Sequence, residues 1–459
     1  MTLNVVTLET TSLGDRSYLA HDGESGVLVD PQRDLDRAID AVESAGVRVS
    51  HVLETHIHND YVTGGLALAQ ELDALYVVAA GEEVDFDRLP AVEGTRFQSG
   101  RLSITVMHTP GHTPYHLSFA ASIDGHEPEA VFTGGSMLYG SVGRTDLIGP
   151  ELTEALTRAQ YRSVRHLAQV LPLGTEVFPT HGFGSFCSAV ETTGTCSTIG
   201  DERHSNIAVR LDDEDLFVNT LMAGLAAYPR YYAHMAPRNR RGPGAADLTP
   251  PVPVDAAELL RRLDGGEWVV DLRDRKAFAR HHLAGTISVE LGDSFATFLG
   301  WVIPWDTPLT VIGESPDQIA EAQRQLSRIG IDRLAGAATG DIGLLAGQRI
   351  VGYPVARFDD LDQGRDHDGR VVLDVRRPDE WRAGHLSGAV HIPFWELESR
   401  VADVPAGEVW VYCASGFRAS IAASLLDRAG RRAVLVDDDW GRVAVLGLPV
   451  SKPDPTAVA

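Results

Sequence analysis

The sequence is poor in lysine and cysteine and has no long apolar run. Lysine occurs only as Lys276 and Lys452, and acidic residues give a formal net charge of −24 over 459 residues. This charge argues against nucleic acid and anionic membrane surfaces as partners. No apolar run approaches the roughly 18 residues of a membrane-spanning helix, so we expect a soluble, cytoplasmic protein. Cys187, Cys196 and Cys413 are too few for a disulfide framework, which fits a reducing compartment.

The length predicts about three domains. Residues 238–253 are rich in proline, glycine and charge without periodicity, as in a linker, and a second break falls near 347–354. We therefore expect blocks at residues 1–240, 250–345 and 353–459.

A cysteine loop lies near the C-terminus. Cys413 follows a strand-like run at 408–412 and precedes a helix-like run at 419–429. Backbone N–H groups at a helix N-terminus favour a thiolate and can hold an anionic sulfur. Four residues separate Cys413 from Arg418, a spacing that predicts a cradle for a thiol or persulfide. We expect Cys413 to be the catalytic nucleophile and Arg418, with the loop N–H groups, to stabilise the anion.

The last two blocks repeat each other. Residues 270–273 align with 373–376, and 282–285 align with 385–388, both at an offset of 103. Short apolar strands alternate with amphipathic helices such as 316–329, which predicts open parallel sheets with helices on both faces. The middle block has neither cysteine nor arginine in the corresponding loop, 313–317, so it is expected to be an inactive copy.

Several motifs of the third block resemble the rhodanese (sulfurtransferase) family. They are Leu373-Asp374-Val375-Arg376, Glu380, the segment 384–389 and Ile392-Pro393, together with the cysteine loop. The resemblance covers residues 353–452 and implies that Cys413 exchanges sulfur between thiosulfate or sulfite and a thiol. The alternative is a structural cysteine in a generic α/β domain.

Histidines in the N-terminal block follow predicted strands. His56, His58 and Asp60 alternate after the run 50–54, and His112 and His181 follow two later strands. Strand-end loops that each offer a histidine or a carboxylate predict a hydrolytic or redox metal site.

The order of these motifs resembles the metallo-β-lactamase fold superfamily. It implies an αββα sandwich, so the predicted fold class is α/β multi-domain: this sandwich, then two rhodanese-like open parallel-sheet domains. With the Thr133-Gly134 turn and the motif at 143–146, the block most resembles glyoxalase II and persulfide dioxygenases. The whole chain is similar to bacterial persulfide dioxygenase–rhodanese fusions of sulfide detoxification. Such proteins hold one ferrous ion through two histidines and an aspartate and oxidise glutathione persulfide.

Two positions depart from that pattern. Gly135 stands where the aspartate ligand is expected, and Tyr61 stands where the superfamily has a second-metal histidine. A dinuclear zinc hydrolase is therefore not expected. His56, His58 and His112 remain as a three-histidine metal set, with Asp60 and His181 as supporting or proton-transferring residues. The implied ion is Fe(II), with Zn(II) as the alternative and an empty site as the third outcome.

Two readings of function follow. In the first, persulfide oxidation at the metal site is coupled to sulfur transfer through Cys413. In the alternative, the protein is a sulfurtransferase alone, and its N-terminal block is a non-catalytic scaffold or sensor. Expected partners are a glutathione-like thiol or persulfide, thiosulfate or sulfite, and a second copy of the chain in a homo-oligomer. Cys196 is either a second sulfur acceptor or an inert loop thiol.

Overall fold

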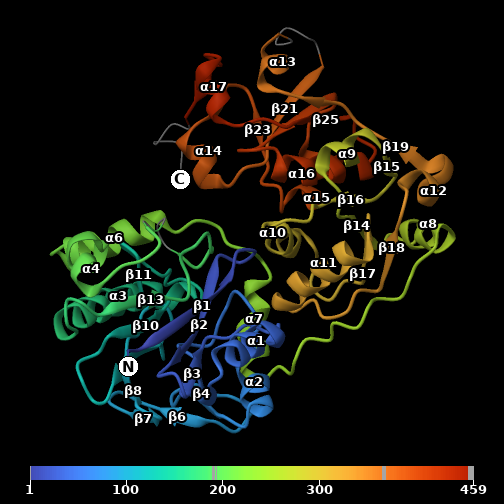
Figure 1. Cartoon of the computed structure of the whole chain (residues 1–459). Coiled ribbons are helices and arrows are strands. Elements are labelled where there is room, and N and C mark those ends of the chain that lie inside the picture. The colour runs from blue at the N-terminus through green and yellow to red at the C-terminus, as the bar shows by residue number, and fades with distance from the viewer. Residues whose placement is uncertain (1, 189–191, 193, 364–368, 453–459) are drawn as a thin grey trace. The chain divides into compact units, whose positions relative to one another are not determined.

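The computed structural model describes residues 2–188, 192, 194–363 and 369–452 (Figure 1). It divides into two compact units, one of residues 1–247 with 327–330 and one of residues 248–326 with 331–459. Among the described residues, no helix is both long and apolar enough to cross a membrane.

The N-terminal unit contains two mixed sheets. The first has the order β1-β2-β3-β4-β5-β6 and the second the order β13-β10-β9-β8-β7. The strands of the first sheet are β1 Asn4–Thr10, β2 Asp15–His21, β3 Ser25–Val29, β4 Arg48–Leu53, β5 Leu75–Ala79 and β6 Leu89–Ala91. Those of the second are β7 Arg96–Ser99, β8 Leu102–His108, β9 Leu117–Ile123, β10 Ala130–Gly134 and β13 Glu176–Pro179, beside a small ribbon of β11 Met137–Leu138 and β12 Ser141–Val142.

Three apolar layers hold this unit together. One lies between the sheets and includes Tyr18, Leu53, Phe119 and Phe132. The other two lie between each sheet and its helices. The helices are α1 Leu35–Ala45, α2 Gly65–Glu71 and α7 Tyr232–Arg240 on the first sheet, and α3 Pro150–Val170, α4 Ile199–Ser205, α5 Ile207–Arg210 and α6 Glu214–Gly224 on the second. The predicted αββα sandwich is confirmed.

The second unit contains two parallel sheets with corresponding strand orders. They read β16-β14-β17-β18 and β23-β21-β24-β25-β20. The strands are β14 Trp268–Asp271, β16 Ile287–Ser288, β17 Leu309–Gly313, β18 Gly336–Thr339, β20 Val355–Ala356, β21 Arg370–Asp374, β23 Val390–His391, β24 Glu408–Tyr412 and β25 Ala433–Val436. Two short antiparallel ribbons pair β15 His282–Leu283 with β19 Ile350–Val351, and β22 His385–Leu386 with β26 Val450–Ser451.

Helices pack on both of these sheets, as the alternating pattern predicts. They are α8 Ala256–Asp264, α9 Arg275–Arg280, α10 Phe295–Val302, α11 Pro316–Arg328, α12 Ile342–Ala346, α13 Phe358–Gln363, α14 Pro378–Ala383, α15 Leu397–Arg400, α16 Phe417–Arg428 and α17 Gly441–Val445, with 3-10 turns η1 Gly347–Arg349 and η2 Val401–Asp403. The helix expected over 316–329 ends one residue earlier.

The sequence repeat is also a repeat of side-chain contacts. Arg273 donates to the carboxylate of Asp271 through Nε at 3.0 Å and through Nη2 at 2.6 Å. Arg376 donates to Asp374 in the same way, at 3.0 and 2.7 Å. The matching donors and acceptors place the two Asp-Arg segments in equivalent turns after β14 and β21.

Candidate functional site

Three buried histidines converge at strand ends of the N-terminal unit. His56 follows β4, His112 follows β8 and His181 follows β13, and each is at most 1% exposed. One ring nitrogen of each lies within 4.8 Å of the others. His56 and His112 thus come together as the sequence predicts, and the third imidazole of their group is that of His181.

The hydrogen bonds of two rings fix which nitrogen faces the cluster. The Thr55 hydroxyl donates to Asp30 at 2.7 Å, so its oxygen accepts from Nδ1–H of His56 at 2.9 Å. Nδ1–H of His112 donates to the carbonyl of Arg144 at 2.7 Å. Both rings therefore present the Nε2 lone pair, which is the group that binds a metal ion.

Burial keeps these two imidazoles neutral. It is the main cause that lowers the pKa of His56 well below its usual range and that of His112 to about 3. Neighbouring imidazoles lower both further. Neutral histidine is the ligating form, so the electrostatics suit a cation.

Two carboxylates orient the third ring. Nδ1 of His181 lies 2.9 Å from Oδ1 of Asp15 and 3.1 Å from Oδ2 of Asp60, and its Nε2 lies 3.3 Å from Nε2 of His56. Burial alone would lower the pKa of His181, but Asp60 and Asp15 raise it well above its ordinary value. A carboxylate behind a histidine is the usual device for aiming that histidine at a metal.

His58, the third ligand expected from sequence, forms a second possible metal-holding group with Asp60 and His181, whose ligand atoms also lie within 4.8 Å of one another. Its Nε2–H donates to Oε2 of Glu54 at 3.0 Å and lies 2.9 Å from the Tyr61 hydroxyl. Burial disfavours its charged form, but Asp30 and Glu54 outweigh this and raise the pKa of His58 to about 9. The hydroxyl of Tyr61, where the resemblance predicts a second-metal histidine, thus lies against the ring of His58.

Gly135 leaves room for the ring of His112. A Cβ at position 135 would lie 2.6 Å from Cγ and 2.7 Å from Nε2 of that ring, closer than side chains pack. The N–H of Gly135 donates to Nε2 of buried His116 at 3.0 Å, which holds the glycine backbone in place. An aspartate cannot enter here unless His112 moves.

The residues present fit a metal ion. Among the described residues, buried His58 Nδ1, Asp60 Oδ1 and His112 Nε2 have no hydrogen-bond partner. Unpaired buried polar atoms are costly, and a cation held by His56, His112 and His181 would satisfy Nε2 of His112. His58 and Asp60 belong with His181 to the second possible group. The donor set of imidazoles with one nearby carboxylate suits Fe(II) or Zn(II).

In the second unit, the loop of Cys413 connects β24 to α16 as predicted. The N–H of Gly416 donates to Sγ of Cys413 at 3.2 Å, and Gly416 adopts a left-handed conformation with φ of 91°. Glycine takes this conformation without strain, which allows the chain to turn its N–H groups toward the sulfur.

Arg418 lies beside the loop, in a bidentate pair. It donates to the two carboxylate oxygens of Glu380 at 2.5 and 2.8 Å. Burial opposes the charge, but Glu380 and the Cys413 sulfur raise the pKa of Arg418. The structure thus adds Glu380 to the predicted Cys413–Arg418 pair.

Comparisons with known proteins match both ends of the chain. The model of the metallo-β-lactamase superfamily matches residues 14–181, and that of the rhodanese-like domain matches residues 358–442. The chain joins a metallo-β-lactamase domain to a rhodanese-like domain.

Relatives of the metallo-β-lactamase domain include a hydroxyacylglutathione hydrolase and a persulfide dioxygenase. Hydroxyacylglutathione hydrolase GloC of Haemophilus influenzae is 25% identical over 44% of this chain and 97% of its own length. Human mitochondrial persulfide dioxygenase ETHE1 is 28% identical over 43% of this chain and 73% of its own length. A metallo-β-lactamase structure from Staphylococcus aureus aligns with a TM-score of 0.67 and 26% identity, over 74% of this chain and all of that one. This homology and the rhodanese-like domain support a role in sulfur metabolism.

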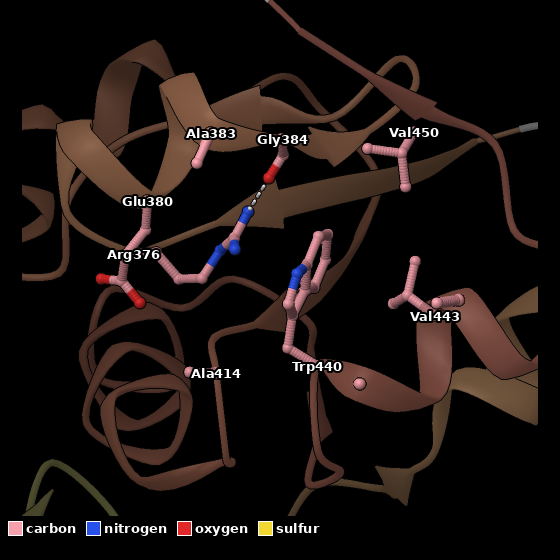
Figure 2. A pocket seen from close by; sticks show the side chains of 10 residues that line it. Arg376, Glu380, Ala383, Gly384, Ala414, Trp440, Val443 and Val450 are labelled. Carbon is pink, nitrogen blue, oxygen red and sulfur yellow. Dashed lines mark hydrogen bonds between the residues drawn. The ribbon is translucent and has the colours of Figure 1, made fainter.

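A pocket of about 470 Å³ opens beside the cysteine loop of the rhodanese-like domain (Figure 2). Ala414, next to the buried Cys413, lines it together with Glu380, Trp440 and Arg376. The Arg376 guanidinium lies 3.9 Å from the centroid of a Trp440 ring and donates to the carbonyl of Gly384 at 2.7 Å. The pocket therefore has a rigid cation–aromatic wall.

Sequence reasoning missed three residues around the histidines of the possible metal site. They are Glu54, which pairs with His58, Asp15, which orients His181, and His116, which holds Gly135. Glu54 and His116 stand next to the motifs that were recognised, so their proximity was a usable signal. Asp15 precedes the first motif by many residues, and only the tertiary fold brings it to His181.

Proposed function

We propose that this protein carries sulfane sulfur on Cys413 and transfers it to a thiol. The supporting observation is the Gly416 N–H on the Cys413 sulfur, at the N-terminus of α16. The Cys413 thiolate attacks the outer sulfur of thiosulfate. A new S–S bond forms as the thiosulfate S–S bond breaks, and sulfite leaves with the electron pair. An acceptor thiolate then takes the outer sulfur as a persulfide, and the Cys413 thiolate is released.

Arg418 and Glu380 support this cycle. The positive charge of Arg418 stabilises the anionic sulfur, and the bidentate pair with Glu380 holds the guanidinium in one orientation. The adjoining pocket has the size for a small thiol or thiosulfate beside Ala414.

We further propose that the N-terminal domain binds an iron ion through His56, His112 and His181. His58 and Asp60 lie beside this set, and Zn(II) is the alternative occupant. When bound, ferrous iron supplies redox chemistry toward dioxygen and a low-molecular-weight persulfide. The chain itself orients His181 through Asp15 and excludes water by burying the imidazoles. This assignment replaces His58 with His181 in the three-histidine set predicted from sequence.

Residues 250–345, called the middle domain below, are proposed to be an inactive rhodanese-like domain. Its support is the corresponding strand order and the repeated Asp-Arg contacts. His282 and His385 extend the repeat, since each stacks on an aromatic ring at 9° to its own plane. The proposed blocks 1–240 and 353–459 are the metal-binding and sulfur-carrying domains.

Gly135 favours a second candidate, a sulfurtransferase whose N-terminal domain is a scaffold or sensor. Loss of the carboxylate removes the anionic ligand expected for iron. Oxygen uptake with glutathione persulfide separates the two candidates, because only the first consumes oxygen.

Thiosulfate:thiol transfer and oxygen uptake are to be measured on one iron-loaded preparation of the full chain. Cys413→Ser should abolish transfer, while Cys196→Ser, a matched change at an exposed thiol, should not. His112→Ala should abolish oxygen uptake and leave transfer intact. Transfer that survives in Cys413→Ser contradicts the sulfur-carrier role. If the metal-replete wild type takes up no oxygen, the second candidate, a protein with sulfurtransferase activity only, is supported.

A further inference from the structure

The helix that follows the cysteine loop is buried along nearly its whole length. All residues from 419 to 426 of α16 are buried, and most of them are alanine or serine. The helix contacts its own strands β24 and β25 and also β16 and α9 of the middle domain. At this second surface, the N–H of Ser288 donates to the hydroxyl of Ser424 at 3.0 Å. The helix whose N-terminus forms the sulfur site therefore packs between two domains.

The other side of the loop touches a buried carboxylate. Asp437, just after β25, has a side chain that is only 3% exposed. A Cβ on Gly416 would overlap Oδ1 of Asp437 and would lie 2.9 Å from its Cγ. Gly416 is the residue whose N–H donates to the Cys413 sulfur. Asp437 therefore lies against Gly416, the residue that donates to the reacting sulfur.

Two cations of the middle domain neutralise this carboxylate. Nε of Arg275 donates to Oδ1 of Asp437 at 2.8 Å, and Nζ of Lys276 lies 3.0 Å from Oδ2. Nη1 of Arg275 donates to Glu290 at 2.7 Å, which fixes the guanidinium from its other edge. Lys276 is one of only two lysines in the whole sequence.

An aromatic contact anchors the loop from a third direction. Phe298 of the middle domain packs its ring 5.4 Å from that of Phe417, the first residue of α16, and 5.5 Å from that of Phe394. Trp301 of the same helix stacks on Trp395 at 4.8 Å. The cysteine loop is therefore held by packing as well as by charge.

We propose that the middle domain is a working part of the sulfur-transfer site, in which Arg275 and Lys276 act as positioning residues through Asp437. An unpaired carboxylate at this place would repel an anionic sulfur and pull on Gly416. When Asp437 is paired with the two cations, it supports Gly416 by packing against it. The N–H of Gly416 then remains hydrogen-bonded to the sulfur. The middle domain can then remain useful to the chain although it has lost its own cysteine. This inference rests on the proposed role of Cys413.

Two arginines near the loop are paired within the C-terminal domain. Arg418 binds Glu380, and Arg376 binds Asp374. The middle domain contributes the cations that balance Asp437, so a change in Arg275 and Lys276 should act on the loop without breaking those pairs.

The test is a charge-rescue cycle in the full-length protein. The variants are Arg275→Ala/Lys276→Ala, Asp437→Asn, and all three changes together. Arg349→Ala, which removes an exposed ion pair between Asp264 of the middle domain and the segment that follows this domain, is the matched control. The readouts are the pH midpoint of Cys413 alkylation by iodoacetamide, and kcat and KM for thiosulfate:thiol transfer.

In the double variant we expect the alkylation midpoint to rise by about one pH unit, which corresponds to one unpaired nearby charge. We expect kcat to fall about tenfold and KM to change less than twofold. Adding Asp437→Asn should return both the alkylation midpoint and kcat most of the way to the wild-type values, because it removes the unpaired charge. The control should match the wild type.

Three results would overturn the inference. One is a double variant that matches the wild type while Cys413→Ser abolishes transfer. Another is a triple variant that recovers nothing, since the defect would then be lost packing. If the double variant fails to fold, Lys276→Ala alone, at a half-exposed side chain, must raise the midpoint or the inference falls. Transfer that persists in Cys413→Ser instead removes the proposed function itself.

Discussion

Gly135 is the position where a single change tests the metal cluster most directly. In Gly135→Ala the added Cβ meets Nε2 of His112 at 2.7 Å. The ring cannot move away at little cost, because it is fully buried and its Nδ1–H is bonded to the carbonyl of Arg144. Overpacking of this kind costs about 1–3 kcal/mol. For a domain of this size, that cost lowers Tm by about 2–12 °C.

Gly135→Asp should behave no better, although it introduces the carboxylate that the sequence resemblance leads us to expect at this position. The same Cβ displaces His112, so one ligand is lost where another is gained. We expect a lower Tm by scanning calorimetry and no gain in iron per chain. Gly174→Ala is the matched control, since no described heavy atom lies within 4 Å of its added Cβ. A Gly135→Asp protein that binds more iron at an unchanged Tm would refute this reasoning.

Further predictions concern the residues that orient the two sites. Asp15→Asn should weaken metal affinity about 10–100-fold in chelator competition, because it removes one of the two negative charges behind Nδ1 of His181; unchanged affinity would contradict its orienting role. Tyr61→Phe should cost about 1 kcal/mol in urea unfolding and leave metal content unchanged, because it deletes only the hydroxyl beside His58. Burial disfavours the charged form of Glu380, but Arg418 outweighs this and lowers the pKa of Glu380 below its ordinary 4.5. The stability from this pair is therefore complete above pH 4.5 and is lost as pH falls through the lower folded value, so Glu380→Gln should flatten that acid limb of Tm against pH.

The fold was predictable because its signals are local and repeated. Short apolar strands, amphipathic helices and the offset of 103 between the last two blocks each indicate parallel α/β layers. One boundary was not predictable in this way. Helix α2 begins at Gly65, where the Thr63 hydroxyl accepts from the N–H of Gly65 and the N–H of Thr63 donates to Oδ1 of Asn239. Asn239 is far away in sequence, so no local pattern reports that contact.

The metal cluster was only half predictable for the same reason. His56 and His112 stand in strong motifs, and both reach the site. Whether His58 or His181 joins them depends on the hydrogen bonds of each ring, and these come from Glu54 and Asp15. Histidine spacing indicates which rings can reach a site, whereas the partner of the second ring nitrogen decides which lone pair faces it.

The repeat separates structural residues from chemical ones within a single chain. The Asp-Arg turn contacts are the same in both copies, at Asp271 and at Asp374, although only the second copy has the cysteine. A contact that persists where the nucleophile is lost is required by the fold and not by sulfur transfer. Chemistry is therefore to be sought in what differs, namely Cys413, Gly416 and Arg418. Arg275 and Lys276 of the middle domain differ from these turn contacts, because both pair with a carboxylate outside that domain, Asp437.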